Sequence, residues 1–189
     1  MITLAETASG LYGAWRLAHA DRTGMAYFDR TPRGAVRSFY AALIAAPGFA
    51  LITLIDLSGH PPSASWPTIL IVEIIGYVIS WTALPAAVFE LSRLVGRGER
   101  FVDFLVAYNW CFVLQVAFFL PVAALAASGL VPENLSSAGL MATYILLLIY
   151  EGYIARVSLD VTIALAVAVV GLDICLSYLI DAAISAILR

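Results

Sequence analysis

Long runs of apolar residues divide the chain into five segments, with short polar stretches between them. The runs cover residues 38–57, 67–92, 101–127, 138–155 and 159–188. A helix needs about 20 mostly apolar residues to cross roughly 30 Å of hydrocarbon. The pattern therefore predicts five membrane-spanning helices, of which the fourth is short and leads directly into the fifth.

Glycine and proline cluster where these runs end, which is typical of turns. They occur in residues 58–63, 96–98 and 128–132. Only helices or closed barrels satisfy every backbone polar group inside lipid. We therefore predict an all-α integral membrane protein, with a five-helix transmembrane domain at residues 38–189 and a cytoplasmic N-terminal segment at residues 1–37.

The N-terminal segment has the pattern of a short amphipathic helix. Thr3 and Glu6 are spaced as a capping box, and Leu11, Trp15 and Ala18 fall near one helical face. Such a helix suits the headgroup layer of a membrane, and it equally suits packing against the protein's own cytoplasmic face. The segment has no apolar stretch before its arginines, so we expect no cleavable signal peptide.

The distribution of arginine predicts the orientation, since cytoplasmic loops carry an excess of basic residues. On one side lie Arg16, Arg22, Arg30, Arg33, Arg37, Arg93, Arg97, Arg100 and Arg156, whereas only Arg189 lies on the other. This places the N-terminus in the cytoplasm and the C-terminus in the periplasm. We expect Arg16, Arg22, Arg30, Arg33 and Arg37 to contact lipid headgroups.

Composition supports the membrane assignment and excludes several other classes. The chain is 62% hydrophobic and 12% charged, whereas soluble domains are about 45–50% apolar and about 25% charged. The net charge of −3 gives no reason to expect nucleic acid as a partner. Arginine without lysine is typical of a GC-rich coding bias, which favours a bacterial cytoplasmic membrane protein.

Four polar residues inside the predicted spans are candidates for an intramembrane site. They are Glu73 and Tyr77 in the second span, and Asp173 and Ser177 in the fifth. Ionisable groups at this depth cost about 2.5–3.5 kcal/mol on insertion scales. One interpretation is an outward-facing acidic cavity that binds a cation or relays a proton. The other is that both acids are neutral and join helices by hydrogen bonds.

Other acids lie nearer the predicted membrane boundary. Glu90, Asp103 and Glu151 each have an arginine within five residues along the chain. We interpret these three as interfacial charges on the cytoplasmic side.

Sequence motifs for catalysis and for cofactor binding are missing. The chain has only two histidines, and neither the serine-hydrolase elbow nor nucleotide- or zinc-binding motifs occur. Cys111 and Cys175 lack the spacing of a redox pair or a zinc site. We therefore expect no enzyme activity and no cofactor.

One loop carries a resemblance to a known family. Leu91-Ser92-Arg93-Leu94-Val95-Gly96-Arg97-Gly98-Glu99-Arg100-Phe101 is similar to the Arg/Gly-rich turn of bacterial Yip1-domain proteins. With five spans and a cytoplasmic N-terminus, residues 35–185 resemble the Yip1-type membrane proteins. The Asp-Leu-Tyr-Gly element of eukaryotic members is matched only partly, by Gly10-Leu11-Tyr12-Gly13, which leaves a trafficking role without support. The resemblance implies a scaffold or interaction protein without assigned catalytic residues.

Two functional hypotheses follow. The leading one is a small inner-membrane protein of scaffold or interaction type, which binds lipid, a partner membrane protein or further copies of itself. The alternative is a transporter or channel component that uses Glu73 and Asp173.

Overall fold

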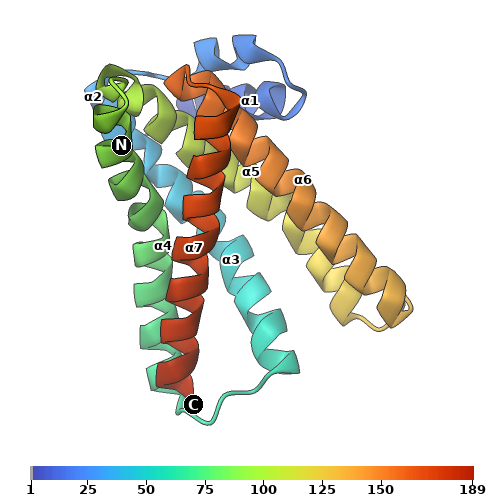
Figure 1. The fold of residues 1–189 in the computed structure, drawn as a ribbon. Helices are drawn as coiled ribbons and strands as arrows, with labels where there is room; N and C mark the ends of the chain where they lie inside the picture. The colour runs from blue at the N-terminus through green and yellow to red at the C-terminus, as the bar shows by residue number, and fades with distance from the viewer. Residues whose placement is uncertain (1) are drawn as a thin grey trace.

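The computed structural model describes residues 2–189 and is built from helices (Figure 1). Five of its helices are long and apolar enough to cross a membrane. The predicted all-α fold with five spans is therefore confirmed. Within residues 2–189 the elements, in chain order, are α1 (Leu4–Ala18), the 3₁₀ helix η1 (Arg22–Tyr27), α2 (Pro32–Ser38), α3 (Tyr40–Gly59), α4 (Trp66–Leu94), the 3₁₀ helix η2 (Gly98–Arg100), α5 (Phe101–Ala127), α6 (Glu133–Leu159) and α7 (Ile163–Leu188).

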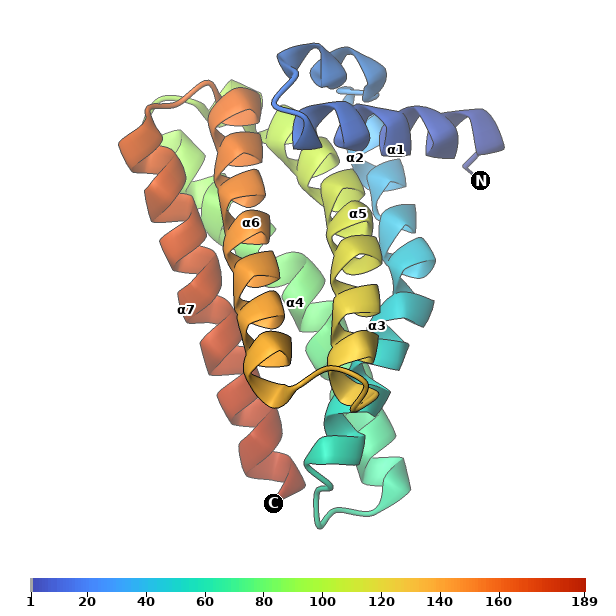
Figure 2. The same ribbon diagram turned by 90° about the vertical axis from the view of Figure 1, so that its right-hand side faces the viewer.

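The long helices run side by side, and their connections alternate between two ends of the bundle (Figure 2). One end carries α1, η1 and the α4–α5 and α6–α7 connections, and we call it the arginine-rich end. It holds nine of the ten arginines. The opposite, arginine-poor end carries the α3–α4 and α5–α6 connections and Arg189. The two groups of connections therefore separate as the arginine pattern predicted.

The fourth and fifth spans have different boundaries from those predicted. Helix α6 is 27 residues long rather than short, because its first turn, beginning at Glu133, is polar and lies outside the apolar run. It ends at Leu159, since Asp160 adopts a left-handed conformation with φ 53°. Thr162 then caps α7 by accepting a hydrogen bond from the Leu165 N–H. Residues 160–162 thus form a sharp turn that hydropathy alone does not reveal.

The first span also begins earlier than predicted. Helix α2 starts at Pro32 and is separated from α3 by a break at Phe39. Thr31 caps α2 by accepting from the Gly34 N–H, and Pro32 fits the first helical position because no intrahelical bond is lost there. The last residues of the predicted N-terminal segment therefore belong to the first span.

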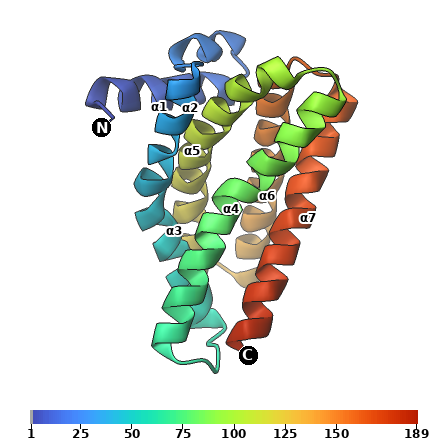
Figure 3. The ribbon, with the colours of Figure 1, turned by 90° about the vertical axis from the view of Figure 1, so that its left-hand side faces the viewer.

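Buried side chains concentrate in the half of the bundle near the arginine-rich end. Helix α5 forms its centre, with Phe104, Ala107 and Cys111 fully buried. Toward the arginine-poor end the α5–α6 hairpin leans away from α4 and α7 (Figure 1). Figure 3 shows α4 running obliquely, beside α7 at the arginine-rich end and toward α3 at the other.

Candidate functional site

The structure places the four predicted site residues in separate surroundings rather than in one site. Glu73 on α4 lies near the arginine-poor end, where Asp56 and Asp181 are the charges that act on it. The Tyr77 hydroxyl donates to the Ala42 carbonyl at 2.6 Å, which joins α4 to α3. In the structure Tyr77 thus bonds a backbone carbonyl rather than an acid.

Asp173 on α7 pairs instead with an acid on α6. Its carboxyl group lies near that of Glu151, at a similar depth on the adjacent helix. Ser177, one turn further along α7, is exposed. The structure thus brings together Asp173 and Glu151, and it leaves Glu73 in a different group of acids.

The interpretation of Glu151 as an interfacial charge is wrong. Its side chain is 4% exposed, and no ion pair with Arg156 is found among the described residues. Glu151 lies about two turns from the end of α6, so its side chain points into the helix packing rather than into the headgroup layer. By contrast, Glu90 pairs with Arg93 at 3.5 Å and Asp103 with Arg100 at 3.2 Å, as predicted.

Several buried polar atoms lack a hydrogen-bond partner in the described part of the protein. They are Trp81 Nε1, Asn109 Oδ1, Gln115 Nε2 and Glu151 Oε1. Most of them lie in the half of the bundle near the arginine-rich end, which we call the packed half. Asn109 is satisfied on its other side, because its Nδ2 donates to Ser38 Oγ at 2.8 Å. Buried polar groups without partners are uncommon, so these positions are the first to consider for ligand, proton or partner binding.

A polar groove of about 570 Å³ opens at the arginine-poor end. Asp56, His60 and Glu73 line one side of it, and Ser185 and Arg189 line the other. Asp173 is not part of this lining. The acids of this groove are therefore Asp56 and Glu73, and the predicted pair of Glu73 with Asp173 is not formed here.

The N-terminal helix α1 packs against the rest of the protein through one of its faces. Ala14 and Leu17 are 0% and 1% exposed. The Tyr150 hydroxyl donates to the Ala14 carbonyl at 2.7 Å, and the Tyr153 hydroxyl to the Ala20 carbonyl at 2.6 Å. Both tyrosines come from α6, so α1 is fastened across the end of the α5–α6 hairpin.

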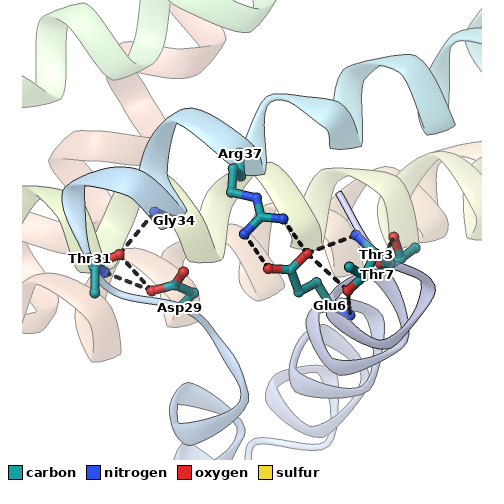
Figure 4. A network of polar contacts seen from close by, with 7 residues as sticks. All are labelled: Thr3, Glu6, Thr7, Asp29, Thr31, Gly34 and Arg37. Atoms are coloured by element: carbon teal, nitrogen blue, oxygen red, sulfur yellow. Dashed lines mark hydrogen bonds and ion pairs between the residues drawn. The ribbon is translucent and has the colours of Figure 1, made fainter. Parts of the chain in front are cut away.

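A polar network fastens the start of α1 to α2 (Figure 4). Arg37 bonds the Glu6 carboxylate at 2.5 and 2.7 Å. Glu6 also closes the predicted capping box with Thr3. The Thr3 backbone N–H, which donates to Glu6, lowers the pKa of the Glu6 carboxyl, and the Thr3 hydroxyl and Arg37 act in the same direction.

Three of the five arginines predicted to contact headgroups also bind acids of this chain. Arg37 pairs with Glu6, Arg16 with Asp21, and Arg30 with Asp103 at 3.5 Å. The hydrogen bond to Asp21, at 2.7 Å from Arg16 Nε, raises the pKa of Arg16. Arg22 and Arg33 are exposed, so of the five they best fit the predicted role of lipid contacts.

The comparisons with known proteins add nothing to this geometry. No family model, no curated protein and no solved structure matches the chain. The resemblance to Yip1-type proteins therefore stays a prediction, and the functional argument rests on the residues themselves.

Sequence reasoning missed the pairing of Glu151 with Asp173. One signal was present, because Tyr144 and Glu151 are seven residues apart and so share a face of α6. Tyr144 indeed lies near the charges of Asp173, Glu151 and Asp181. The nearness of Arg156 in sequence was misleading, since a difference of five residues turns its side chain to another face of the helix.

Proposed function

We propose that this chain is a non-enzymatic membrane protein that binds a transmembrane segment of a partner membrane protein. The observation that carries the proposal is the polar face of α7 in the half near the arginine-poor end. Ser177 and Asp181 are exposed there, and Tyr144 of α6, which is 45% exposed, lies near the same acids. Carboxyl groups facing lipid are costly, so this face favours a partner that covers it.

The charges on this face indicate the chemistry of the partner. Asp56, Glu73 and Asp181 act on one another, whereas Arg189 is the only arginine at this end. A second copy of the chain would therefore bring more acids than bases to the contact. A partner helix with basic side chains, or with hydroxyl and amide donors, complements the face better.

The same proposal includes the orientation and the location. We place the N-terminus in the cytoplasm of a bacterial cell and the C-terminus in the periplasm, on the basis of the nine arginines at one end. Single cysteines introduced at Ser63 and at Arg97 should then react with membrane-impermeant reagents from opposite sides. Reaction of both from one side would contradict this topology.

Site-directed photo-crosslinking in intact membranes tests the partner. A photoreactive residue at Ser177 should capture one reproducible membrane protein, whereas the same residue at Val167, which is 63% exposed on the same helix, should capture mainly lipid. Asp181→Asn should lower the capture at Ser177 several-fold, and Glu133→Gln at the start of α6 should not. Capture of lipid alone at both positions would rule out the proposal.

A second candidate function is a transporter or channel component, which the polar groove beside Asp56 and Glu73 favours. Its test is ion or proton flux in reconstituted liposomes with the double substitution Glu73→Gln and Asp173→Asn. Flux that is unchanged by the substitutions, or that is absent from both proteins, excludes this function.

A further inference from the structure

The contact between Glu151 and Asp173 lies at matching depths on two adjacent helices. Glu151 is eight residues before the end of α6, and Asp173 is ten residues after the start of α7. At 1.5 Å per residue, these offsets are about 12 and 15 Å from the same end of the bundle. The two carboxyl groups therefore meet inside the membrane, away from the headgroups.

Within residues 2–189, no basic group is found to act on this pair of acids. Each is the only charged group that acts on the other, and Glu151 Oε1 is buried without a donor among the described residues. On the neighbouring helices, α5 contributes the buried Tyr108, whose hydroxyl lies near both acids. Helix α4 contributes apolar side chains to this region, including Leu84 and Val88.

Two carboxylate charges in contact at this depth would repel each other with little screening, because the surroundings have a low dielectric constant. A proton held between the two oxygens removes one charge and replaces the repulsion by a short, charge-assisted O–H···O bond. It also supplies the donor that Glu151 Oε1 lacks. We propose that Glu151 and Asp173 form a buried proton-binding site that joins α6 to α7 through one shared proton.

The number of oxygen atoms favours a proton over a metal ion. Calcium takes about 6–8 oxygen ligands, whereas this site offers two carboxyl groups and the Tyr108 hydroxyl, and helical carbonyls are already engaged in backbone bonds. No group of three or more ionisable ligand residues that could hold a metal ion occurs among residues 2–189. A proton needs only one oxygen atom from each of the two carboxyl groups.

The proton site and the proposed partner face are neighbours on α7, with Asp173 one turn before Ser177, but different measurements test them. Failure of the crosslinking experiment would therefore leave the proton site standing, and loss of the proton site would leave the partner face.

Infrared spectroscopy of the protein in lipid nanodiscs tests the site directly. The wild type at neutral pH should show the absorption of a protonated carboxyl group, and this absorption should fall at alkaline pH. Glu151→Gln and Asp173→Asn should each remove most of it, whereas the control Glu133→Gln, at an exposed residue at the start of α6, should preserve it. Absence of the absorption in the wild type would overturn the proposal, as would its full retention in both single variants.

Thermal unfolding provides a second measurement, which needs only folded protein. The wild type and Glu133→Gln should unfold at lower temperature when the pH is raised, because loss of the shared proton leaves two like charges close together. Each single amide variant removes one of those charges, so its unfolding temperature should change much less over the same range. If a variant does not fold, the fall of the wild-type unfolding temperature at alkaline pH is the deciding result. A wild-type unfolding temperature that is independent of pH would refute the shared proton.

Discussion

The two halves of α6 differ sharply in their surroundings. Residues 151–159, near the arginine-rich end, contain all of its buried side chains, whereas residues 133–150 contain none. Helix α3 shows the same contrast, since its buried residues, Ala41 and Ala45, both lie near its start. One half of the bundle is therefore held by side-chain packing within the chain. The other half leaves its helix faces to lipid or to a partner.

The contrast separates two ways of stabilising helices in a membrane. Association inside lipid depends on close packing and on hydrogen bonds between helices, because lipid tails are as apolar as leucine. The packed half has both, with close contact around Phe104 and a bond between Ser38 and Asn109. The half near the arginine-poor end has few such contacts. Its conformation therefore depends more on the lipid or partner protein around it.

The largest expected effect comes from matched leucine truncations in the two halves. Leu84→Ala should lower the free energy of unfolding by about 2–4 kcal/mol, because it leaves a cavity beside Val88 and Phe104. Leu125→Ala, at a side chain 50% exposed, should change it by less than about 0.5 kcal/mol. Unfolding in mixed detergent micelles measures both. Equal losses would show that the two halves are packed alike.

A smaller effect is expected from matched glycine substitutions. A Cβ on Gly10 would collide with the Trp110 ring, whereas a Cβ on Gly171 would meet nothing within 4 Å. Gly10→Ala should therefore destabilise the docking of α1 by roughly 1–3 kcal/mol, and Gly171→Ala should be neutral or slightly stabilising. Hydrogen exchange over α1 reports the change. Unaltered protection of α1 in Gly10→Ala would contradict its close contact with α5.

The smallest effect concerns the fastening of α1 at acid pH. The pKa of Glu6 is lowered in the folded protein, so its contribution is complete above the ordinary pKa of glutamate. This stabilising contribution of the Glu6 carboxylate is lost as the pH falls through the lowered pKa of the folded protein. Protection of the α1 amides against exchange should therefore weaken in acid, and Glu6→Gln should show weaker protection already at neutral pH. A pH-independent difference between the two proteins would argue against a role for the carboxylate.

The fold was largely predictable because each span can be recognised from the hydropathy of its own segment, without knowledge of its neighbours. All five were found, and the third has the predicted bounds. The end of α6 was not found, because it depends on the left-handed Asp160 and the Thr162 cap. Both residues lie between two apolar segments, so the hydropathy pattern shows no clear break there.

The candidate site was predicted less well, since it depends on which helices are neighbours. The depths of Glu73 and Asp173 along their own helices allowed them to meet, but Asp173 lies beside Glu151 of α6 instead. Nothing in the sequence indicated that the Tyr77 hydroxyl bonds the Ala42 carbonyl. The period of 3.6 residues predicts which side chains of one helix lie close together, but it does not predict which side chains of two different helices do.

The turn at residues 160–162 has a consequence for biogenesis. Only three residues separate α6 from α7, so neither helix can enter the bilayer far ahead of the other. Glu151 and Asp173 lie on the two arms of this hairpin, and each would pay the full insertion cost of an acid if its arm entered alone. If α6 and α7 enter the bilayer together, Glu151 and Asp173 can come close to each other before either side chain is exposed to lipid. The brevity of this turn thus favours insertion of α6 and α7 together, as one hairpin.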